Sequence, residues 1–293
     1  MQNIINFFLD IIKQRLLPGS VFIKMKYKKN FGYKLNLKNP QTFTEKIQWL
    51  KLNNKDDLLT QCADKLAVRK YIKEKIGEEY LIPLVFYTYN ADDIDPEKLP
   101  DFPVIIKTNH GSGGVIIVED KTKCDFKEIR KNLKDALKLN FYYLGREWEY
   151  KNIKPCIIVE KLLRDESGND VLNDYKIHCL NGVPQYIQTI FDRHIEVKEN
   201  WYDTKWNLLD VYYYSPIKKE IPKPVFLDEL LRIAAILSKD FIYVRVDLYS
   251  SHNQIYFGEL TFRPLAGFMK FKPQEFDKIM GEKLVLPIIG SKL

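Results

Sequence analysis

Two strand-like segments joined by a polar turn, near the C-terminal end of the chain, constrain its fold more than any other feature. Residues 243–264 are dense in Val, Tyr and Phe on both sides of the turn, which favours a β-hairpin. Side chains two residues apart share a face of a strand, so Arg245 points the same way as Asp247, and Glu259 the same way as Thr261. The hairpin can therefore bring two carboxylates together beside a cation. Such carboxylates either hold a hard divalent ion such as Mg²⁺ or lie on a solvated sheet face.

The composition is that of an ordinary globular protein, and the charge balance narrows its partners. The 293 residues can form one large or two modest domains. A net charge of +7 favours an anionic partner such as a nucleotide, an anionic saccharide or the cytoplasmic face of a membrane. The basic residues are dispersed along the chain, so we expect no nucleic acid as a partner.

The cysteines and the N-terminal segment bear on location. Four cysteines lie far apart with no CxxC motif, which predicts free thiols in a reducing compartment: Cys62, Cys124, Cys156 and Cys179. Residues 1–17 are apolar but are interrupted by charged side chains, so we expect neither a signal peptide nor a membrane-spanning helix. The segment would form either a helix packed on its own domain or an interfacial helix. We expect a cytoplasmic protein, with peripheral contact at the inner membrane face as an open alternative.

Residues 1 to about 60 have helical patterns, and a second helix is expected from about Leu58 to Ile76. Thr42 and Glu45 have the spacing of a capping box, which predicts a helix start at this point. The second helix carries Lys65, which together with a following arginine could address one anion or could belong to a solvated charged face.

A glycine-rich turn between two β-branched strands is the second informative pattern. Residues 103–118 form a strand that ends at Lys107, a turn with Gly111, Gly113 and Gly114, and a returning strand. Glycine amides can form a concave anion-binding nest, and the lysine would add a positive charge to a phosphate held there. The spacing matches neither a P-loop nor a Rossmann fingerprint. The turn therefore either clamps phosphates between two strands or is an ordinary hairpin turn.

The middle of the chain adds a strand, a hairpin and two helices. Residues 155–163 read as a buried strand running into a linker that could recognise an adenine edge. Residues 174–189 form a hairpin over Asn181-Gly182 in which Asp174 and Lys176 share one face. Helices are expected at 126–139 and 227–237, and the aromatic stretch 141–151 follows the first of them.

Several of these motifs occur in one order that resembles the ATP-grasp superfamily, and more narrowly its teichuronopeptide-biosynthesis-like branch, which is found among bacterial surface-polysaccharide genes. The motifs that carry the resemblance are residues 43–51, Ala63-Asp64-Lys65, 109–113, Gly145-Arg146-Glu147-Trp148, 150–155, Asp174-Tyr175-Lys176 and Phe257-Gly258-Glu259. The resemblance spans about residues 40–270. It implies an α+β fold, with two α+β subdomains that clamp ATP and a short, mostly helical N-terminal segment. The expected boundaries are 1–60 for that segment, 61–160 for the glycine-loop subdomain and 161–293 for the metal-hairpin subdomain.

The resemblance also implies ATP and Mg²⁺ as cofactors, and it assigns roles to individual residues. The implied nucleotide-binding residues are Lys65, Lys107, His110, Gly111, Ser112, Gly113, Gly114, Glu160, Lys161, Leu162, Leu163 and Asp174. The implied metal ligands are Asp247, Glu259 and Thr261, the last at a position where many ATP-grasp enzymes have asparagine. The implied catalytic residues are Arg245, Arg193 and Lys176. Residues 263–267 depart from the small, glycine-containing turn that the family places after the metal strand.

By this resemblance the chain would be an ATP- and Mg²⁺-dependent carboxylate–amine ligase that works through an acylphosphate. The expected substrates are a small-molecule or saccharide carboxylate, such as a uronic acid, and an amine or amino acid. The expected setting is capsule or cell-surface polysaccharide biosynthesis, with contact to glycan-assembly enzymes. Two alternatives stay open: a phosphotransferase for a sugar or amine on the same fold, and a non-catalytic nucleotide-binding module or glycosyltransferase-associated protein.

Overall fold

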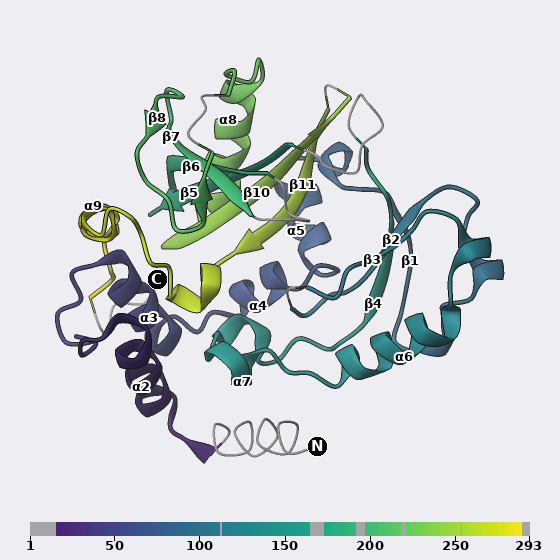
Figure 1. Cartoon of the computed structure of the whole chain (residues 1–293), viewed down its shortest axis with the longest axis horizontal. Helices are drawn as coiled ribbons and strands as arrows, with labels where there is room; N and C mark the ends of the chain where they lie inside the picture. Colours follow the sequence, from purple (N-terminus) through teal and green to yellow (C-terminus); the bar gives the residue numbers. More distant parts are fainter. Residues whose placement is uncertain are drawn as a thin grey trace.

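The computed structural model describes residues 16–111, 113–164, 173–191, 197–217, 221–252 and 254–288. Within these ranges the chain forms two mainly antiparallel sheets and several helices (Figure 1). The smaller sheet lies on the right of Figure 1, the larger sheet lies at the upper left, and helices α4 (Asp57–Ala63) and α5 (Val68–Lys75) lie between them.

The smaller sheet holds the glycine-rich turn. Its strands, in spatial order, are β1 (Leu84–Thr88), β4 (Ile157–Lys161), β2 (Val104–Thr108) and β3 (Ile116–Val118). Alternate residues of β2, including Val104 and Ile106, are buried against α6 (Phe126–Leu137). The expected strand–turn–strand pattern across residues 103–118 and the expected helix after it are confirmed.

The larger sheet holds the C-terminal hairpin. Its strands, in spatial order, are β11 (Gln254–Thr261), β10 (Tyr243–Ser251), β5 (Asn173–Leu180), β6 (Val183–Phe191), β7 (Lys198–Asp203) and β8 (Leu208–Leu209), with β9 (Ser215–Pro216) beside β7. Helix α8 (Leu227–Ser238) packs on one face of this sheet, where its apolar side chains join the largest hydrophobic cluster of the described residues. Both expected hairpins, β5–β6 and β10–β11, are confirmed.

Helices from the two ends of the chain pack together. Helices α2 (Gly19–Phe31) and α3 (Phe43–Asn53) precede the sheets, and α9 (Glu275–Lys283) follows them. The expected capping box is present: Thr42 accepts a hydrogen bond from the Glu45 amide, and the Glu45 carboxylate accepts one from the Thr42 amide. Buried Asp277 of α9 accepts hydrogen bonds from the amide and the hydroxyl of Thr44 at 2.8 and 2.6 Å, which ties α9 to α3.

The single helix expected from Leu58 to Ile76 was wrong. The chain forms α4 and α5 with a turn at residues 64–67 between them. The Asp64 carboxylate accepts hydrogen bonds from the amides of Leu66 and Ala67 at 2.8 and 3.2 Å, and these bonds compete with a continuous helix. Lys65 therefore lies in the turn between the two helices and not on a helix.

The remaining short elements are helix α7 (Tyr142–Gly145) and 3-10 helices. The latter are η1 (Glu78–Tyr80), η2 (Ala91–Asp93), η3 (Pro96–Lys98), η4 (Lys121–Lys123), η5 (Trp148–Tyr150) and η6 (Pro264–Gly267). In the part of the chain that the structure describes, no helix has the length and apolar character needed to cross a membrane. The interfacial-helix hypothesis falls mostly on residues 1–15, outside the described ranges.

Candidate functional site

The β10–β11 hairpin brings its two carboxylates into register. Asp247 pairs directly with Glu259, and Arg245 pairs with Thr261. A β-bulge at Gly258 shifts the register immediately after this pair. A Cβ at residue 258 would lie 2.7 Å from the Tyr249 ring and 3.0 Å from the Asp247 carbonyl oxygen, so the bulge requires glycine. The bulge thus ends the regular pairing at the point where the carboxylates meet.

Arg245 is the positive centre of this cluster. Its guanidinium donates to both oxygens of Asp247 at 2.6 and 2.7 Å, and Nη2 also lies 3.2 Å from Glu259 Oε1 and 3.0 Å from Thr261 Oγ1. Lys176 on neighbouring β5 forms a second bridge, to Asp247 and, at 2.9 Å, to Asp174. Asp247 is therefore buried between two cations, while Glu259 remains partly open.

The local charges control the ionisation of Glu259. Burial raises its pKa, but the positive charges of Lys65, Arg245 and Lys176 outweigh burial and lower the pKa to about 2. Glu259 is therefore a carboxylate at every physiological pH.

Acid unfolding should report this charge. Because the folded-state pKa is depressed, the ionised Glu259 stabilises the fold above its ordinary pKa of 4.5, and this stabilisation is lost as the pH falls from there toward about 2. We expect the free energy of unfolding of the wild type to fall more steeply across that window than that of Glu259→Gln. Urea denaturation at a series of pH values measures the two curves. Parallel curves would contradict the assignment.

Lys65 links the turn after α4 to both sheets. Its Nζ donates to the Gly111 carbonyl at 2.5 Å and lies 3.9 Å from Glu259 Oε2. Buried Asn109 fixes this arrangement, since its side chain donates to Asp64 at 2.8 Å and accepts from the Cys156 amide at 2.7 Å. Burial lowers the pKa of Lys65, and the neighbouring Glu259 charge opposes that shift. The lysine thus connects the glycine-rich turn with the hairpin.

Lys107 and Glu160 line a narrow cleft that also contains Lys65. Lys107 Nζ lies 2.7 Å from Glu160 Oε2, and Arg69 Nη1 lies 3.1 Å from Glu160 Oε1. The cleft is narrow, about 10 Å³, and these residues line it together with Lys65 and Gly258. The structure therefore gathers three cations within one cleft: Lys65, Arg69 and Lys107.

The glycine-rich turn adopts left-handed backbone conformations that glycine allows. Gly113 and Gly114 have φ values of 81° and 65°, where L-residues are strained, and no atom lies within 4 Å of a Cβ built on either of them. Buried His110 is bonded to the Leu139 carbonyl at 3.1 Å and packs edge-on against Phe141. Its contacts are therefore with the segment after α6, while Ser112 and Arg193 lie outside the described residues.

The expected adenine segment, residues 160–163, comprises the last two residues of β4 and the two residues that follow it. The Leu162 side chain is buried, its amide donates to the Pro103 carbonyl at 3.0 Å, and the Lys161 amide donates to the Pro83 carbonyl at 3.0 Å. The Lys161 side chain is exposed and Leu163 is half-buried. These residues lie at the end of the same strand as Glu160, beside the narrow cleft.

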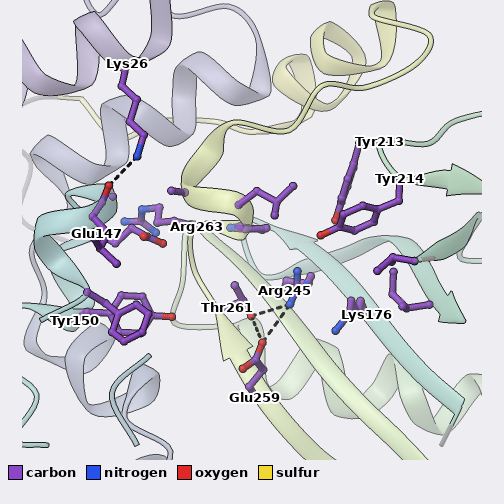
Figure 2. Close-up of a pocket in the computed structure, with 18 residues that line it drawn as sticks. Lys26, Glu147, Tyr150, Lys176, Tyr213, Tyr214, Arg245, Glu259, Thr261 and Arg263 are labelled. Atoms are coloured by element: carbon purple, nitrogen blue, oxygen red, sulfur yellow. Dashed lines mark hydrogen bonds and ion pairs between the residues drawn. The ribbon is translucent and has the colours of Figure 1, made fainter. Parts of the chain in front are cut away.

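Arg245, Asp247, Glu259 and Thr261, together with Lys176, form the hairpin cluster. A cavity of about 620 Å³ opens beside it (Figure 2). Lys176, Arg245, Glu259 and Thr261 line this cavity, while the preceding hairpin residues Phe257 and Gly258 line the narrow cleft. Several other parts of the chain complete its lining. They supply Lys26 on α2, Phe141, Leu144, Gly145, Glu147 and Tyr150 around α7 and η5, Ile190 and Val197, Tyr213 and Tyr214, and Arg263 to Ala266 around η6. The departure of residues 263–267 from the family pattern thus falls on the wall of this cavity.

The oxygen donors of the hairpin suit Mg²⁺. Asp247, Glu259 and Thr261 each place an oxygen within 3.2 Å of the single atom Arg245 Nη2, so the three donors converge around one positive group. Hard carboxylate and hydroxyl oxygens are the ligands that Mg²⁺ prefers. Among the described residues, no three His, Cys, Asp or Glu side chains form a cation site by themselves, so water or phosphate oxygens would complete the coordination.

Sequence reasoning missed part of the cavity lining and the partner of Glu160. Tyr213 and Tyr214 line the cavity, but they lie in a segment without a regular pattern. The pairing of Arg69 with Glu160 joins residues 91 positions apart, and no spacing signals it. The sequence indicated Glu147 only as a member of the motif at residues 145–148 and assigned it no role.

The sequence profile of the TupA-like ATP-grasp family matches residues 45–285. No curated protein gives a significant match. Among solved structures, the chain is similar to a D-alanine–D-alanine ligase from Bacillus anthracis complexed with ATP, at 18% identity and a TM-score of 0.41, covering 70% of this chain and 57% of that one. It is also similar to the ATP-grasp ligase PsnB complexed with a phosphomimetic variant of its minimal precursor, Mg and ADP, at 11% identity and a TM-score of 0.45, covering 82% of this chain and 65% of that one. The chain thus spans less than two thirds of the length of each of these structures. Because the profile covers most of the sequence, the chain belongs to the TupA-like ATP-grasp family.

Proposed function

We propose that the protein is an ATP- and Mg²⁺-dependent carboxylate–amine ligase that joins an amine or amino acid to a uronic acid or similar carboxylate during surface-polysaccharide synthesis. Family membership supports the ATP-dependent reaction. The observation that carries the proposal is the position of the β10–β11 hairpin: Gly258 lines the cation-rich cleft, and the next residue, Glu259, lines the 620 Å³ cavity together with Arg245. A phosphate donor and an acceptor could therefore meet at Glu259 and Arg245.

The cleft supplies the charges that a triphosphate needs. Lys65 and Lys107 face Glu259 and Glu160, and ATP phosphates would replace these carboxylates as partners of the two lysines. The glycine-rich turn would close over the phosphates with its backbone amides. Mg²⁺ held by Asp247, Glu259 and Thr261 would neutralise charge on the phosphates when bound.

The cavity suits a saccharide carboxylate. Tyr213 and Tyr214 offer aromatic surface for a sugar ring, and Lys176 and Arg245 offer positive charge for its carboxyl group. Attack of that carboxylate on the γ-phosphate of ATP would give an acylphosphate and release ADP, and an amine would then attack the acyl carbon and displace phosphate. Arg245 would stabilise the oxyanion of the tetrahedral intermediate. The buried free thiols of Cys62, Cys156 and Cys179 agree with the cytoplasmic location that we propose.

One assay separates this function from its alternatives. The protein is incubated with ATP, Mg²⁺, glucuronate, galacturonate and their UDP-linked forms, and a pool of amino acids and simple amines. We expect ADP release together with a product whose mass equals both substrates less one water. A mass gain of one phosphate would indicate a phosphotransferase. ATP binding without turnover would indicate a non-catalytic module.

Replacing Lys107 should weaken nucleotide binding. We expect Lys107→Ala to lower the affinity for ATP about 10-fold or more, because a charge-assisted contact to a phosphate is lost. Isothermal titration calorimetry with a nonhydrolysable ATP analogue measures this effect. The matched control is Lys131→Ala on α6, which removes the same charge from an exposed position. Equal affinities of the two variants would remove Lys107 from the phosphate site.

A further inference from the structure

None of the residues of the motif Gly145-Arg146-Glu147-Trp148 lines the narrow cleft, but two of them, Gly145 and Glu147, line the cavity. Figure 2 shows Glu147 and Tyr150 on one side and Arg245, Glu259 and Thr261 on the other. The chain reverses here through Arg146, which has a left-handed backbone with φ of 58°. A Cβ at residue 145 would collide with the Glu147 carboxylate and lie 3.1 Å from Ala266 Cβ, so glycine makes the room that this carboxylate occupies.

Several cations face Glu147, and each already has a partner. Lys26 of α2 donates to the Leu144 carbonyl at 2.8 Å. Lys51 of α3 donates to the Ala266 carbonyl. Arg263 donates to the Phe262 carbonyl at 2.9 Å and contacts Asn54 at 3.3 Å.

No hydrogen bond or ion pair within the described residues satisfies the Glu147 carboxylate itself. A carboxylate that lines a cavity without a partner can bind a cation that enters the cavity.

The ionisation of Glu147 suits proton transfer near neutral pH. Burial raises its pKa most, and the negative charge of buried Glu149 raises it further. The positive charges of Lys51, Arg263 and Lys26 oppose both effects, and the resulting pKa is about 7. Burial raises the pKa of the Tyr150 hydroxyl well above its ordinary range, and the negative charges of Glu147 and Glu259 raise it further. This hydroxyl therefore stays protonated. A general base is most effective when its pKa lies near the working pH.

We propose that Glu147 binds the ammonium group of the amine substrate and takes its proton before the amine attacks the acylphosphate. This inference rests on the proposed ligase function and adds the residue that selects and activates the second substrate. One proton passes from the ammonium group to the Glu147 carboxylate. The amine lone pair then forms the C–N bond, the C–O bond to phosphate breaks, and phosphate leaves with that electron pair. The second N–H proton goes to the departing phosphate, which leaves as hydrogen phosphate.

Hydroxylamine distinguishes the two halves of the reaction. At neutral pH hydroxylamine is largely unprotonated, so it traps an acylphosphate as a hydroxamate without needing a base. Amino acids and alkyl amines are protonated and do need one. The experiment compares hydroxamate and amide formation by wild type, Glu147→Gln and the surface control Glu282→Gln, with ATP, Mg²⁺ and the uronic acids named above. The control side chain is 66% exposed on α9.

We expect Glu147→Gln to form hydroxamate within about two-fold of the wild-type rate while amide formation at pH 7 falls about 10²-fold or more. Amide formation by the variant should recover as the pH approaches the pKa of the amine itself, whereas the wild-type rate should level off above about pH 7. Glu282→Gln should match wild type in both reactions.

Two results overturn the inference while leaving the ligase function in place: wild-type amide rates in Glu147→Gln, or an equal loss of hydroxamate and amide. A wild type that forms neither product from any of the acids overturns the ligase function itself, and the inference with it. Each outcome therefore identifies which of the two statements fails.

Discussion

Glu259→Gln is expected to lower ATP-dependent turnover about 10²- to 10³-fold while the fold remains intact. The substitution keeps the shape of the side chain but removes the charge that Lys65, Arg245 and Lys176 surround. A neutral amide is a poor ligand for Mg²⁺ and no longer balances the lysine that would hold a phosphate. ADP release measures turnover, and calorimetry with and without Mg²⁺ measures whether the metal still strengthens ATP binding. We expect that enhancement to be lost.

The control for this variant is Glu282→Gln, which removes the same charge from an exposed ion pair with Lys278. Circular dichroism and thermal unfolding verify that both variants are folded. Undiminished turnover in Glu259→Gln, or an unchanged effect of Mg²⁺ on ATP affinity, would refute the assignment of Glu259 as a metal ligand.

Arg245→Met is expected to lower the free energy of unfolding by about 3–5 kcal/mol. Asp247 is 1% exposed and receives two hydrogen bonds from Arg245, so removal of the guanidinium leaves a buried carboxylate with Lys176 as its remaining cation. The cost arises from the uncompensated charge more than from the lost attraction. Urea denaturation at neutral pH, with the midpoint and slope fitted together, measures the change.

The matched control is Arg232→Met on α8, whose ion pair with Glu229 is exposed and should contribute about 1 kcal/mol or less. A double variant, Arg245→Met with Asp247→Asn, should lose less stability than the sum of the two single variants, because it removes the buried charge as well. Additive losses, or a loss in Arg245→Met no larger than in the control, would show that the pair does not support the fold.

Local patterns predicted the elements that hold the site. The density of Val, Tyr and Phe on both sides of a polar turn predicted β10–β11, the Asn181-Gly182 pair predicted β5–β6, and the Thr42–Glu45 spacing predicted the start of α3. Each depends on residues within a few positions of one another, which is the range over which backbone preference acts. The break between α4 and α5 was missed because the side chain of Asp64 bonds to the backbone of the turn and also to Asn109, 45 residues away.

The sequence by itself determined which residues share a strand face, where the glycines permit a tight turn, and to which family the order of motifs points. Only the tertiary structure decided which distant residues come together. It places Lys65 beside the Gly111 carbonyl and Glu259, and Arg69 beside Glu160. It also places Glu147 in the lining of the cavity that Arg245 lines. The contacts of Lys65 with Gly111 and of Arg69 with Glu160 join residues 46 and 91 positions apart. Periodicity within one helix or strand carries no information at that range, because packing between sheets selects the partners.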